Sequence, residues 1–217
     1  MATPSVHTLL NGYLMPTDQG NPAFCAVYLI ESDDGRIVFD CGHVGRRKAL
    51  LAALCERGLS PGDIATVVVS HGHWDHLQNV DLFQRARVIL HPHELRYLKA
   101  PSRRDLGTPP WTSAVLDGLD VREASEGEQL ASGVRVVELP GHTPGSIGLA
   151  VDADDGTAVL TGDAVPAAGV LLAREPLGRA FDSASARASI ERVAELADVV
   201  HPGHDKSFRV TRAERSR

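Results

Sequence analysis

The sequence predicts an α/β fold in which two β-sheets pack against each other and helices cover their outer faces. Two observations predict this class. Short β-branched, apolar runs alternate with segments of helical periodicity, and the order of strands and then helix occurs twice. The segments richest in histidine and aspartate lie at the ends of such runs. Because the loops that follow strands often carry function, we expect one site where these segments meet, along one edge of the sheets.

The length and composition suit one domain that spans residues 1–217. Of the 217 residues, 43% are hydrophobic and 23% are charged, which is ordinary for a folded domain with a sizeable core. The net charge of −6 argues against nucleic acid as a partner, because nucleic-acid-binding domains usually present a basic surface. The short basic runs at 46–48 and 103–104 are typical of solvated faces. We therefore expect a small-molecule substrate.

The sequence does not indicate a membrane or an oxidising compartment. No apolar stretch reaches the length of a membrane span, and the residues after Met1 lack the basic and then apolar pattern of a secretory signal. Cys25, Cys41 and Cys55 lack the spacing of a disulfide framework, which fits reduced thiols. These features predict a cytoplasmic protein, and they leave a homodimer open.

The first half of the chain is expected to hold four strands and two helical segments. The second apolar run is nearly continuous, and Asp33-Asp34-Gly35 after it is a typical hairpin turn. An apolar stripe at helical spacing later runs as far as Gly58, a residue type common just after helices. The predicted strands are residues 6–14, 23–32, 36–40 and 67–69, and the predicted helical segments are 45–57 and 77–83.

The densest group of metal-binding side chains follows the strand 67–69, in the segment Ser70-His71-Gly72-His73-Trp74-Asp75-His76. Gly72 lets the backbone turn sharply, so His71 and His73 can point in the same direction. Asp75 and His76 lie next to the helical segment and face a slightly different point. Imidazole and carboxylate are the ligands that Zn²⁺ prefers where one coordination position stays open. The spacing predicts two neighbouring metal positions rather than an ordinary polar loop.

The second half of the chain is expected to repeat the order of strands and helix. One apolar run ends at His91-Pro92-His93-Glu94, which we interpret as a strand passing into a helix rather than as a second metal site. Later strands end at Pro140-Gly141-His142 and at Gly162-Asp163, and an amphipathic helix follows Asp182 or Ser183 as its cap. The predicted strands are residues 88–90, 134–139, 147–151, 158–161 and 199–200, and the predicted helix is 184–197.

Two long irregular segments, residues 100–113 and 164–183, are expected to form walls of a cleft. Loops of this length in a small domain are often lids or binding loops. Trp111 in the first segment either covers an apolar substrate group or packs the loop down. Trp74 and Trp111 are therefore candidate substrate contacts. Cys41, His43 and Gln78 lie close to the predicted site, but no role is assigned to them.

The polar segments match, in order, the motifs of a known family. His71-Gly72-His73-Trp74-Asp75-His76 resembles the HxHxDH signature of the metallo-β-lactamase fold superfamily. The other matching motifs are Phe39-Asp40-Cys41-Gly42, Pro140-Gly141-His142-Thr143, Thr161-Gly162-Asp163 and Pro202-Gly203-His204-Asp205. The resemblance runs from about residue 40 to residue 205. It implies an αβ/βα four-layer sandwich with two sheets and outer helices.

The resemblance also implies which residues hold metal. One ion would be bound by His71, His73 and His142, a second by Asp75, His76 and His204, with Asp163 bridging the two. Asp40 would orient the histidine loop without touching metal. Two Zn²⁺ ions per chain are implied, with iron or manganese as alternatives. Asp75 and Asp163 would be the catalytic carboxylates, beside a metal-bridging hydroxide that attacks the substrate.

The bond that is cleaved stays open among several branches of the family. The first hypothesis is an ester, lactone or thioester, because the segment around Gly203-His204-Asp205 resembles acyl-homoserine lactonases and His73-Trp74-Asp75-His76 resembles glyoxalase II. The alternative is a zinc phosphodiesterase or nuclease, since residues 59–83 and 199–210 resemble small metallo-β-lactamase-domain-containing proteins linked to RNA processing. A mononuclear iron persulfide dioxygenase, which normally leaves the second metal position empty, shares the histidine and aspartate motifs.

Other roles within the family are disfavoured by single residues. No cysteine stands in a ligand motif, which argues against a β-lactamase with a thiolate ligand. His73 stands where flavodiiron proteins usually have a glutamate. A non-catalytic binding module is disfavoured because none of the implied ligands is missing.

Overall fold

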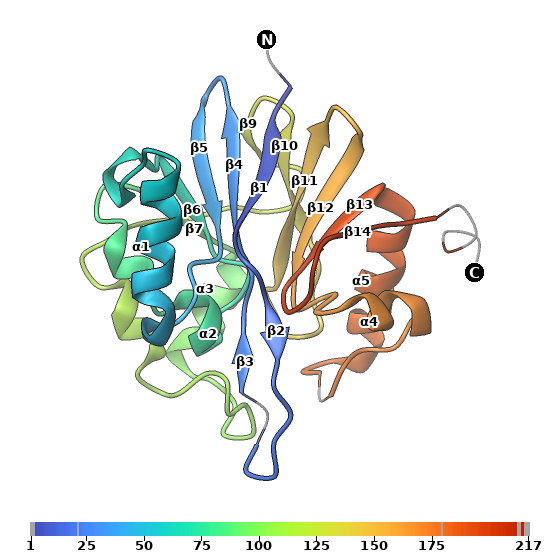
Figure 1. Cartoon of the computed structure of the whole chain (residues 1–217). Coiled ribbons are helices and arrows are strands. Elements are labelled where there is room, and N and C mark those ends of the chain that lie inside the picture. The colour runs from blue at the N-terminus through green and yellow to red at the C-terminus, as the bar shows by residue number, and fades with distance from the viewer. Residues whose placement is uncertain (1–2, 21, 179, 212–213, 215–217) are drawn as a thin grey trace.

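Two six-stranded β-sheets lie face to face at the centre of the structure, and helices cover the outer face of each sheet (Figure 1). This computed structural model describes residues 3–20, 22–178, 180–211 and 214. The layers follow the order helix, sheet, sheet and helix, which confirms the predicted α/β sandwich. Within the described ranges no helix is both long and apolar enough to cross a membrane.

The first sheet contains four parallel strands, β5 to β8, whose carboxyl ends share one edge. β4 pairs antiparallel with β5, and β1 pairs antiparallel with β4. The residues that follow β5, β6 and β7 therefore come together at that edge. In spatial order the strands are β1 (Ser5–Leu10), β4 (Val27–Ser32), β5 (Gly35–Phe39), β6 (Thr66–Val68), β7 (Arg87–Leu90) and β8 (Asp120–Glu123).

The second sheet brings three further strand ends to the same region. β12 and β13 are parallel, and both β10 and β12 pair antiparallel with β11, so β10, β12 and β13 run in one direction. In spatial order the strands are β14 (Phe208–Arg209), β13 (Val199–Pro202), β12 (Gly156–Gly162), β11 (Ile147–Ala153), β10 (Val134–Glu138) and β9 (Gln129–Ala131).

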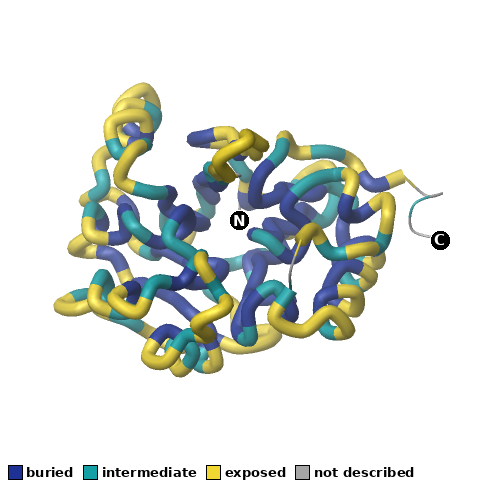
Figure 2. The backbone as a smooth tube through the Cα atoms, turned by 90° about the horizontal axis from the view of Figure 1, so that it is seen from below, coloured by how far each residue is buried: buried dark blue, intermediate teal, exposed yellow. Residues whose placement is uncertain are grey.

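Three hydrophobic layers hold the sheets and helices together. Alternate residues of β4 face opposite sides, so Val27 and Leu29 pack under the helices while Tyr28 and Ile30 pack between the sheets. Full burial of such a side chain contributes about 1.5–3 kcal/mol. The helices are α1 (Arg47–Glu56), α2 (Trp74–Leu77) and α3 (Pro92–Lys99) on the first sheet, and α4 (Ala168–Ala173) and α5 (Ser183–Leu196) on the second. Figure 2 shows buried backbone in the interior and exposed residues around the periphery.

Two predicted strands are interrupted where they pass the end of β13. Residues 6–14 divide into β1 and β2 (Tyr13–Leu14), and residues 23–32 divide into β3 (Ala23–Phe24) and β4. A Cβ atom on Gly12 would lie 2.4 Å from the carbonyl oxygen of Gly203, and Ala26 N–H donates to the same oxygen at 2.6 Å. The chain therefore turns away, and β2 and β3 form a separate hairpin (Figure 1).

Several short elements differ from the sequence prediction. The helical segment predicted at 77–83 was wrong in its bounds: α2 spans Trp74–Leu77, and only a 3-10 turn, Val80–Leu82, lies within the predicted range. The segment 164–183 was predicted to be irregular, but it contains α4. Three edge strands, β8, β9 and β14, were not predicted. β8 is mostly exposed and polar, so its strand conformation depends on pairing with β7 and not on an apolar pattern.

Candidate functional site

Five strand ends deliver polar residues to one region between the two sheets. Asp40 follows β5, the segment with His71 follows β6, and His142, Asp163 and His204 follow β10, β12 and β13. Each of these positions matches a motif found in the sequence. The topology therefore explains why polar segments far apart in the chain form one site.

The first group of potential metal ligands is His71, His73, His142 and Asp163. One donor atom from each residue lies within 4.8 Å of the others. His142 Nε2 is 3.0 Å from His73 Nδ1, and 3.4 Å from Asp163 Oδ2. The side chains of His73 and His142 are 15% and 19% exposed, so this group borders on solvent.

The second group is Asp75, His76 and His204, and it is more deeply buried. Its donor atoms also lie within 4.8 Å of one another. His76 Nε2 is 3.3 Å from His204 Nε2. Asp163 Oδ1 lies 3.1 Å from His204 Nε2 and 3.3 Å from His76 Nε2, so Asp163 contacts both groups. The structure thus brings together all seven residues that the resemblance implied as ligands.

The chemistry of these groups fits divalent metal ions such as Zn²⁺. Three atoms of these groups, His71 Nε2, Asp75 Oδ2 and Asp163 Oδ1, are buried without a hydrogen-bond partner within the described residues. Leaving a buried polar atom unpaired costs about 1–3 kcal/mol. Five imidazoles and two carboxylates converge here, and nitrogen and oxygen donors of this kind are suitable ligands for zinc. A bound cation would satisfy the unpaired atoms.

Burial keeps two histidines of the first group neutral. It lowers the pKa of His71 well below its ordinary value, and lowers the pKa of His142 to about 3 although Asp163 opposes the change. Neutral imidazole is the form that binds a metal ion. The first group therefore does not need to release protons from these two rings before it binds a cation.

The second group is electrostatically different. Burial disfavours protonation of His76 and His204, but nearby carboxylates outweigh burial, and Asp163 raises the pKa of both rings. Burial also opposes ionisation of Asp163, yet His204 and His76 hold its pKa well below the ordinary range. Cation binding at this group therefore competes with protons on the two histidines.

Asp40 holds the histidine segment in place, in the position that the resemblance implied. Its Oδ1 accepts the N–H of Ser70 at 2.7 Å, and its Oδ2 accepts the Ser70 hydroxyl at 2.9 Å and lies 2.8 Å from His76 Nδ1. The backbone of Asp40 has φ 56°, a left-handed conformation that is uncommon outside glycine. Such strain persists where the surrounding contacts fix the residue, as they do here.

A third set of close donor atoms comprises Cys25, Asp40 and His76. Burial raises the pKa of the Cys25 thiol well above its ordinary value, so the sulfur stays protonated and is a poor ligand. Asp40 is already occupied by Ser70 and His76. The thiol of Cys41 donates to the carbonyl of His76, and His43 accepts the N–H of Gly45. Neither Cys41 nor His43 joins the two ligand groups.

His91 and His93 lie apart from the ligand groups, which confirms the interpretation of a strand passing into a helix. His91 accepts the N–H of His93 as the cap of α3. The neighbouring Glu94 has a role that the sequence did not reveal. Its fully buried carboxylate accepts the N–H groups of Gly72 and Gly145 and the hydroxyl of Thr143. Glu94 thus joins the loop of His71 and His73 to the loop of His142.

Two other residues that were not predicted as site residues contact ligand histidines. The Ser70 hydroxyl lies 2.9 Å from His71 Nδ1, which leaves Nε2 facing the other ligands. Asp105 Oδ1 lies 3.1 Å from His73 Nε2. Ser70 could have been suspected because it adjoins the motif, whereas the place of Asp105 depends on the conformation of an irregular loop.

A pocket of about 420 Å³ opens beside the first group. Its walls include His73 and His142 and parts of both segments predicted to line a cleft, Arg104 and Leu106 from 100–113 and Phe181 from 164–183. Residue 179 lies outside the described residues. The two tryptophans do not line this pocket: the Trp74 ring packs on His43, and Trp111 is 55% exposed. Their roles as substrate contacts stay predictions.

Comparison with known proteins agrees with the fold and the site. The sequence model of the Metallo-beta-lactamase superfamily matches residues 20–204. The chain belongs to the metallo-β-lactamase superfamily, and it is a metal-dependent hydrolase.

Particular relatives share the fold and parts of the sequence. Metallo-beta-lactamase domain-containing protein 1 of Xenopus laevis is 33% identical over 211 residues, covering 95% of this chain and 82% of the relative. N-acyl homoserine lactonase AiiB of Agrobacterium fabrum is 31% identical over 164 residues, covering 58% of this chain and 57% of the relative. A structure of an AiiA variant from B. thuringiensis, with N-decanoyl-L-homoserine bound at the active site, has a TM-score of 0.78 over 94% of each chain at 20% identity. This last likeness shows the fold alone.

Proposed function

We propose that this protein is a dinuclear zinc hydrolase that cleaves an ester, lactone or thioester, with lactones as the first candidates. The observation that carries the proposal is the position of Asp163, which contacts both groups of donor atoms. A carboxylate between two cations offsets their mutual repulsion. This arrangement supports two neighbouring ions, with Asp163 between them.

Each of the two groups of residues would hold one ion, and two carboxylates would have further roles. His71, His73 and His142 would hold one ion, and Asp75, His76 and His204 the other. When bound, such a pair supplies an acidified water as the nucleophile and polarises the substrate carbonyl. Asp75 Oδ2 is buried and accepts no hydrogen bond from a described residue, so it would bind the second ion, and the other carboxylate oxygen of Asp75 would take the proton that the water releases. Ionised Asp163 fixes the spacing of the two groups.

The lining of the pocket supports an acyl substrate. Leu106 and Phe181 offer apolar surface beside His73 and His142, and Tyr97 and Ser102 add hydroxyl groups. The other lining residues are mostly polar, so the pocket offers an acyl chain a limited apolar surface among hydrogen-bonding groups. The names of the lactonases that resemble this chain make N-acyl homoserine lactones the first substrates to test.

The deciding experiment compares two substrates on the same protein. Initial rates are measured on an N-acyl homoserine lactone and on bis(p-nitrophenyl) phosphate, with zinc-loaded protein and after treatment with a chelator. We expect faster, chelator-sensitive opening of the lactone. Faster cleavage of the phosphodiester would overturn the proposed bond specificity.

A zinc phosphodiesterase is the second candidate, and one observation favours it. Arg104 lines the same pocket, and no ion pair joins its guanidinium to a carboxylate in the described ranges. Guanidinium binds phosphate strongly. The Arg104→Ala substitution separates the candidates, because it should slow phosphodiester cleavage while having little effect on a neutral lactone.

A mononuclear iron persulfide dioxygenase is disfavoured by the second group. Asp75, His76 and His204 are all present and buried, with donor atoms within 4.8 Å. Metal analysis of the purified protein gives the test. We expect about two zinc ions per chain, and about one iron ion would favour the dioxygenase.

A further inference from the structure

The irregular segment 100–113 contacts His73, one of the proposed metal ligands, from outside the site. His73 has two ring nitrogens that face opposite surroundings. Nδ1 points towards His142 Nε2 at 3.0 Å, and Nε2 lies 3.1 Å from Asp105 Oδ1. Asp105 thus meets His73 on the side away from the other ligands.

Asp105 is itself held by several groups. Its Oδ2 accepts the hydroxyl of Tyr97 on α3 at 2.9 Å, and its Oδ1 accepts the N–H of Gly107 at 2.9 Å. The Asp105 side chain is only 17% exposed. Its contact with His73 has the distance of an ion pair but not the alignment of a hydrogen bond. The carboxylate therefore lies close enough to Nε2 to favour a proton on that nitrogen.

A backbone hydrogen bond also joins the segment 100–113 to the histidine motif. The N–H of Trp74 donates to the carbonyl of Gly107 at 2.9 Å. A Cβ atom on Gly107 would lie 2.6 Å from the ring of His73, so only glycine allows this approach. The loop backbone therefore packs directly on the ligand ring.

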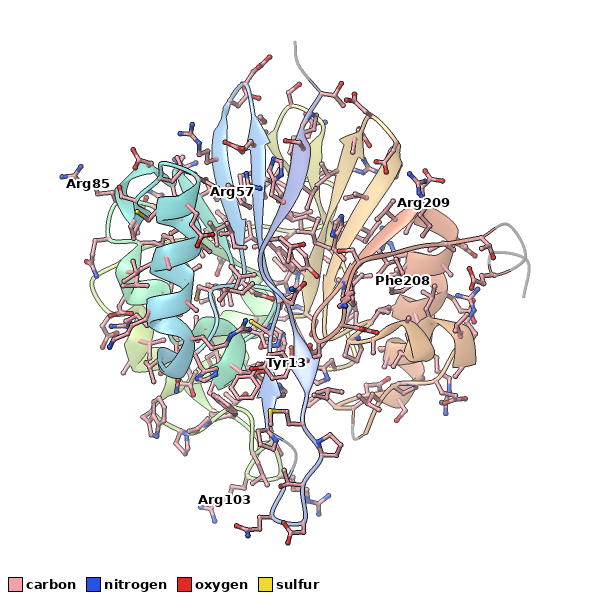
Figure 3. All side chains as sticks on the ribbon, in the orientation of Figure 1. Tyr13, Arg57, Arg85, Arg103, Phe208 and Arg209 are labelled. Atoms are coloured by element: carbon pink, nitrogen blue, oxygen red, sulfur yellow. The ribbon has the colours of Figure 1, made fainter. Side chains whose placement is uncertain are left out.

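The same segment forms one wall of the pocket. Ser102, Arg104, Asp105 and Leu106 line it together with Tyr97. Arg103 of this segment projects at the lower end of the molecule in Figure 3. One carboxylate thus links the orientation of a metal ligand to the shape of the pocket.

We propose that Asp105 is a positioning residue for His73, and that it couples cation binding at the first group to the order of residues 100–113. The inference rests on the proposed metal site. A ring that binds a cation through Nδ1 carries its proton on Nε2, and a carboxylate beside Nε2 favours that tautomer. Because coupling is reciprocal, a loop that strengthens zinc binding is stabilised by zinc to the same degree.

The first test measures zinc affinity by competition with a chromophoric chelator, without any substrate. The variants are Asp105→Asn, which keeps the shape and removes the charge, and Asp117→Asn, an equal charge change at an exposed residue outside the segment. We expect the zinc affinity of the first group to fall about 10–100-fold in Asp105→Asn. In Asp117→Asn it should match the unmodified protein.

The second test reads the order of the loop directly. Arg103 and Arg104 provide trypsin cleavage sites within the segment. Cleavage after these residues is followed by mass spectrometry with and without zinc, and the ratio of the two rates is compared within each variant. Zinc should protect the segment in the unmodified protein and in Asp117→Asn, and protection should be lost in Asp105→Asn.

The outcomes separate this inference from the proposed function. Unchanged zinc affinity and unchanged protection in Asp105→Asn would overturn the inference, and so would zinc binding that leaves the unmodified loop equally open to trypsin. Failure of the unmodified protein to bind zinc would instead overturn the proposed metal site. If Asp105→Asn does not fold, Tyr97→Phe removes the hydroxyl that donates to Asp105 Oδ2 and accepts the N–H of Ser102, and it should weaken zinc affinity and protection by a smaller factor.

Discussion

The two groups of potential metal ligands differ in their burial and in the elements that hold them in place. Asp75, His76 and His204 are at most 5% exposed, and Asp40 at the end of β5 fixes His76 directly. His73 and His142 are partly exposed, and they depend on a loop and on the first turn of α3. The second group, called the buried group below, is positioned by the sheets. The first group, called the open group below, is completed by segments that also line the pocket. Substrate binding and metal binding therefore meet on the open side.

The largest effect is expected where the two groups meet. Asp163→Ala removes a carboxylate that contacts both groups, so we expect turnover to fall by about 10³-fold or more. Metal content should fall below two ions per chain. Hydrolysis rates and elemental analysis check this result, and near-normal activity would contradict the assignment of Asp163.

Asp40→Ala should damage the buried group next. Ser70 and His76 would lose their carboxylate partner, and alanine would occupy a left-handed backbone position. We expect a loss of about 3 kcal/mol in the free energy of unfolding. Chemical denaturation measures the loss. Asp40→Asn, which keeps the shape and one acceptor, should lose less, and equal losses would show that Asp40 contributes through its charge and not through its shape.

Acid should lower the free energy of unfolding through His201, which lies in the strand before His204 of the buried group. Burial lowers the pKa of this β13 histidine from 6.5 to about 4. The unfolded chain therefore binds more protons between these two values, and stability falls as pH drops through this window. The loss attributable to His201 is on the order of 3 kcal/mol. Unfolding free energies of the protein and of His201→Gln at pH 7 and pH 4.5 measure it, and equal pH dependence would exclude His201 as the cause.

Glu94→Gln tests the support of the open group. Glutamine keeps one acceptor oxygen but presents an amide to at least one of three donors, so we expect a loss of about 1–3 kcal/mol in stability. Leu98→Ala on the same helix removes packing against Gly72 and leaves these hydrogen bonds intact. Zinc affinity should fall more in Glu94→Gln than in Leu98→Ala at a comparable loss of stability.

The smallest effect concerns the pocket wall. Phe181→Ala should raise KM for an acyl substrate about tenfold, because Phe181 lines the pocket beside the open group. Trp111→Ala should change KM by less than about twofold, since Trp111 does not line that pocket. Steady-state kinetics on both variants check this ranking. The reverse order would restore Trp111 as a substrate contact.

The strand ends that carry the candidate ligands could be predicted from the sequence. The apolar runs before Asp40, His71 and Asp163 are short and β-branched, so their ends are defined within a residue or two. Parallel pairing then brings the ends together without further information. The αβ/βα architecture followed from the same runs, together with the family resemblance.

The supports of the open group could not be predicted in this way. Glu94 stands in the first turn of a helix, where an acidic residue usually faces solvent. Its burial results from two loops that fold over it, and no local pattern encodes that contact. Asp105 lies in a segment without periodicity, so its place beside His73 follows from turns and backbone contacts that the sequence does not specify.

The contact between His76 and His204 joins residues 128 positions apart in the chain. Gly12 and Ala26 near the amino end press against Gly203, directly before His204. Contacts of such long range form late, because closing a large loop costs entropy before any contact compensates for it. During biosynthesis, residues 71–76 emerge long before residue 204. A nascent chain can therefore present histidines to a metal ion well before it can enclose that ion, and enclosure of the second group awaits the last strands.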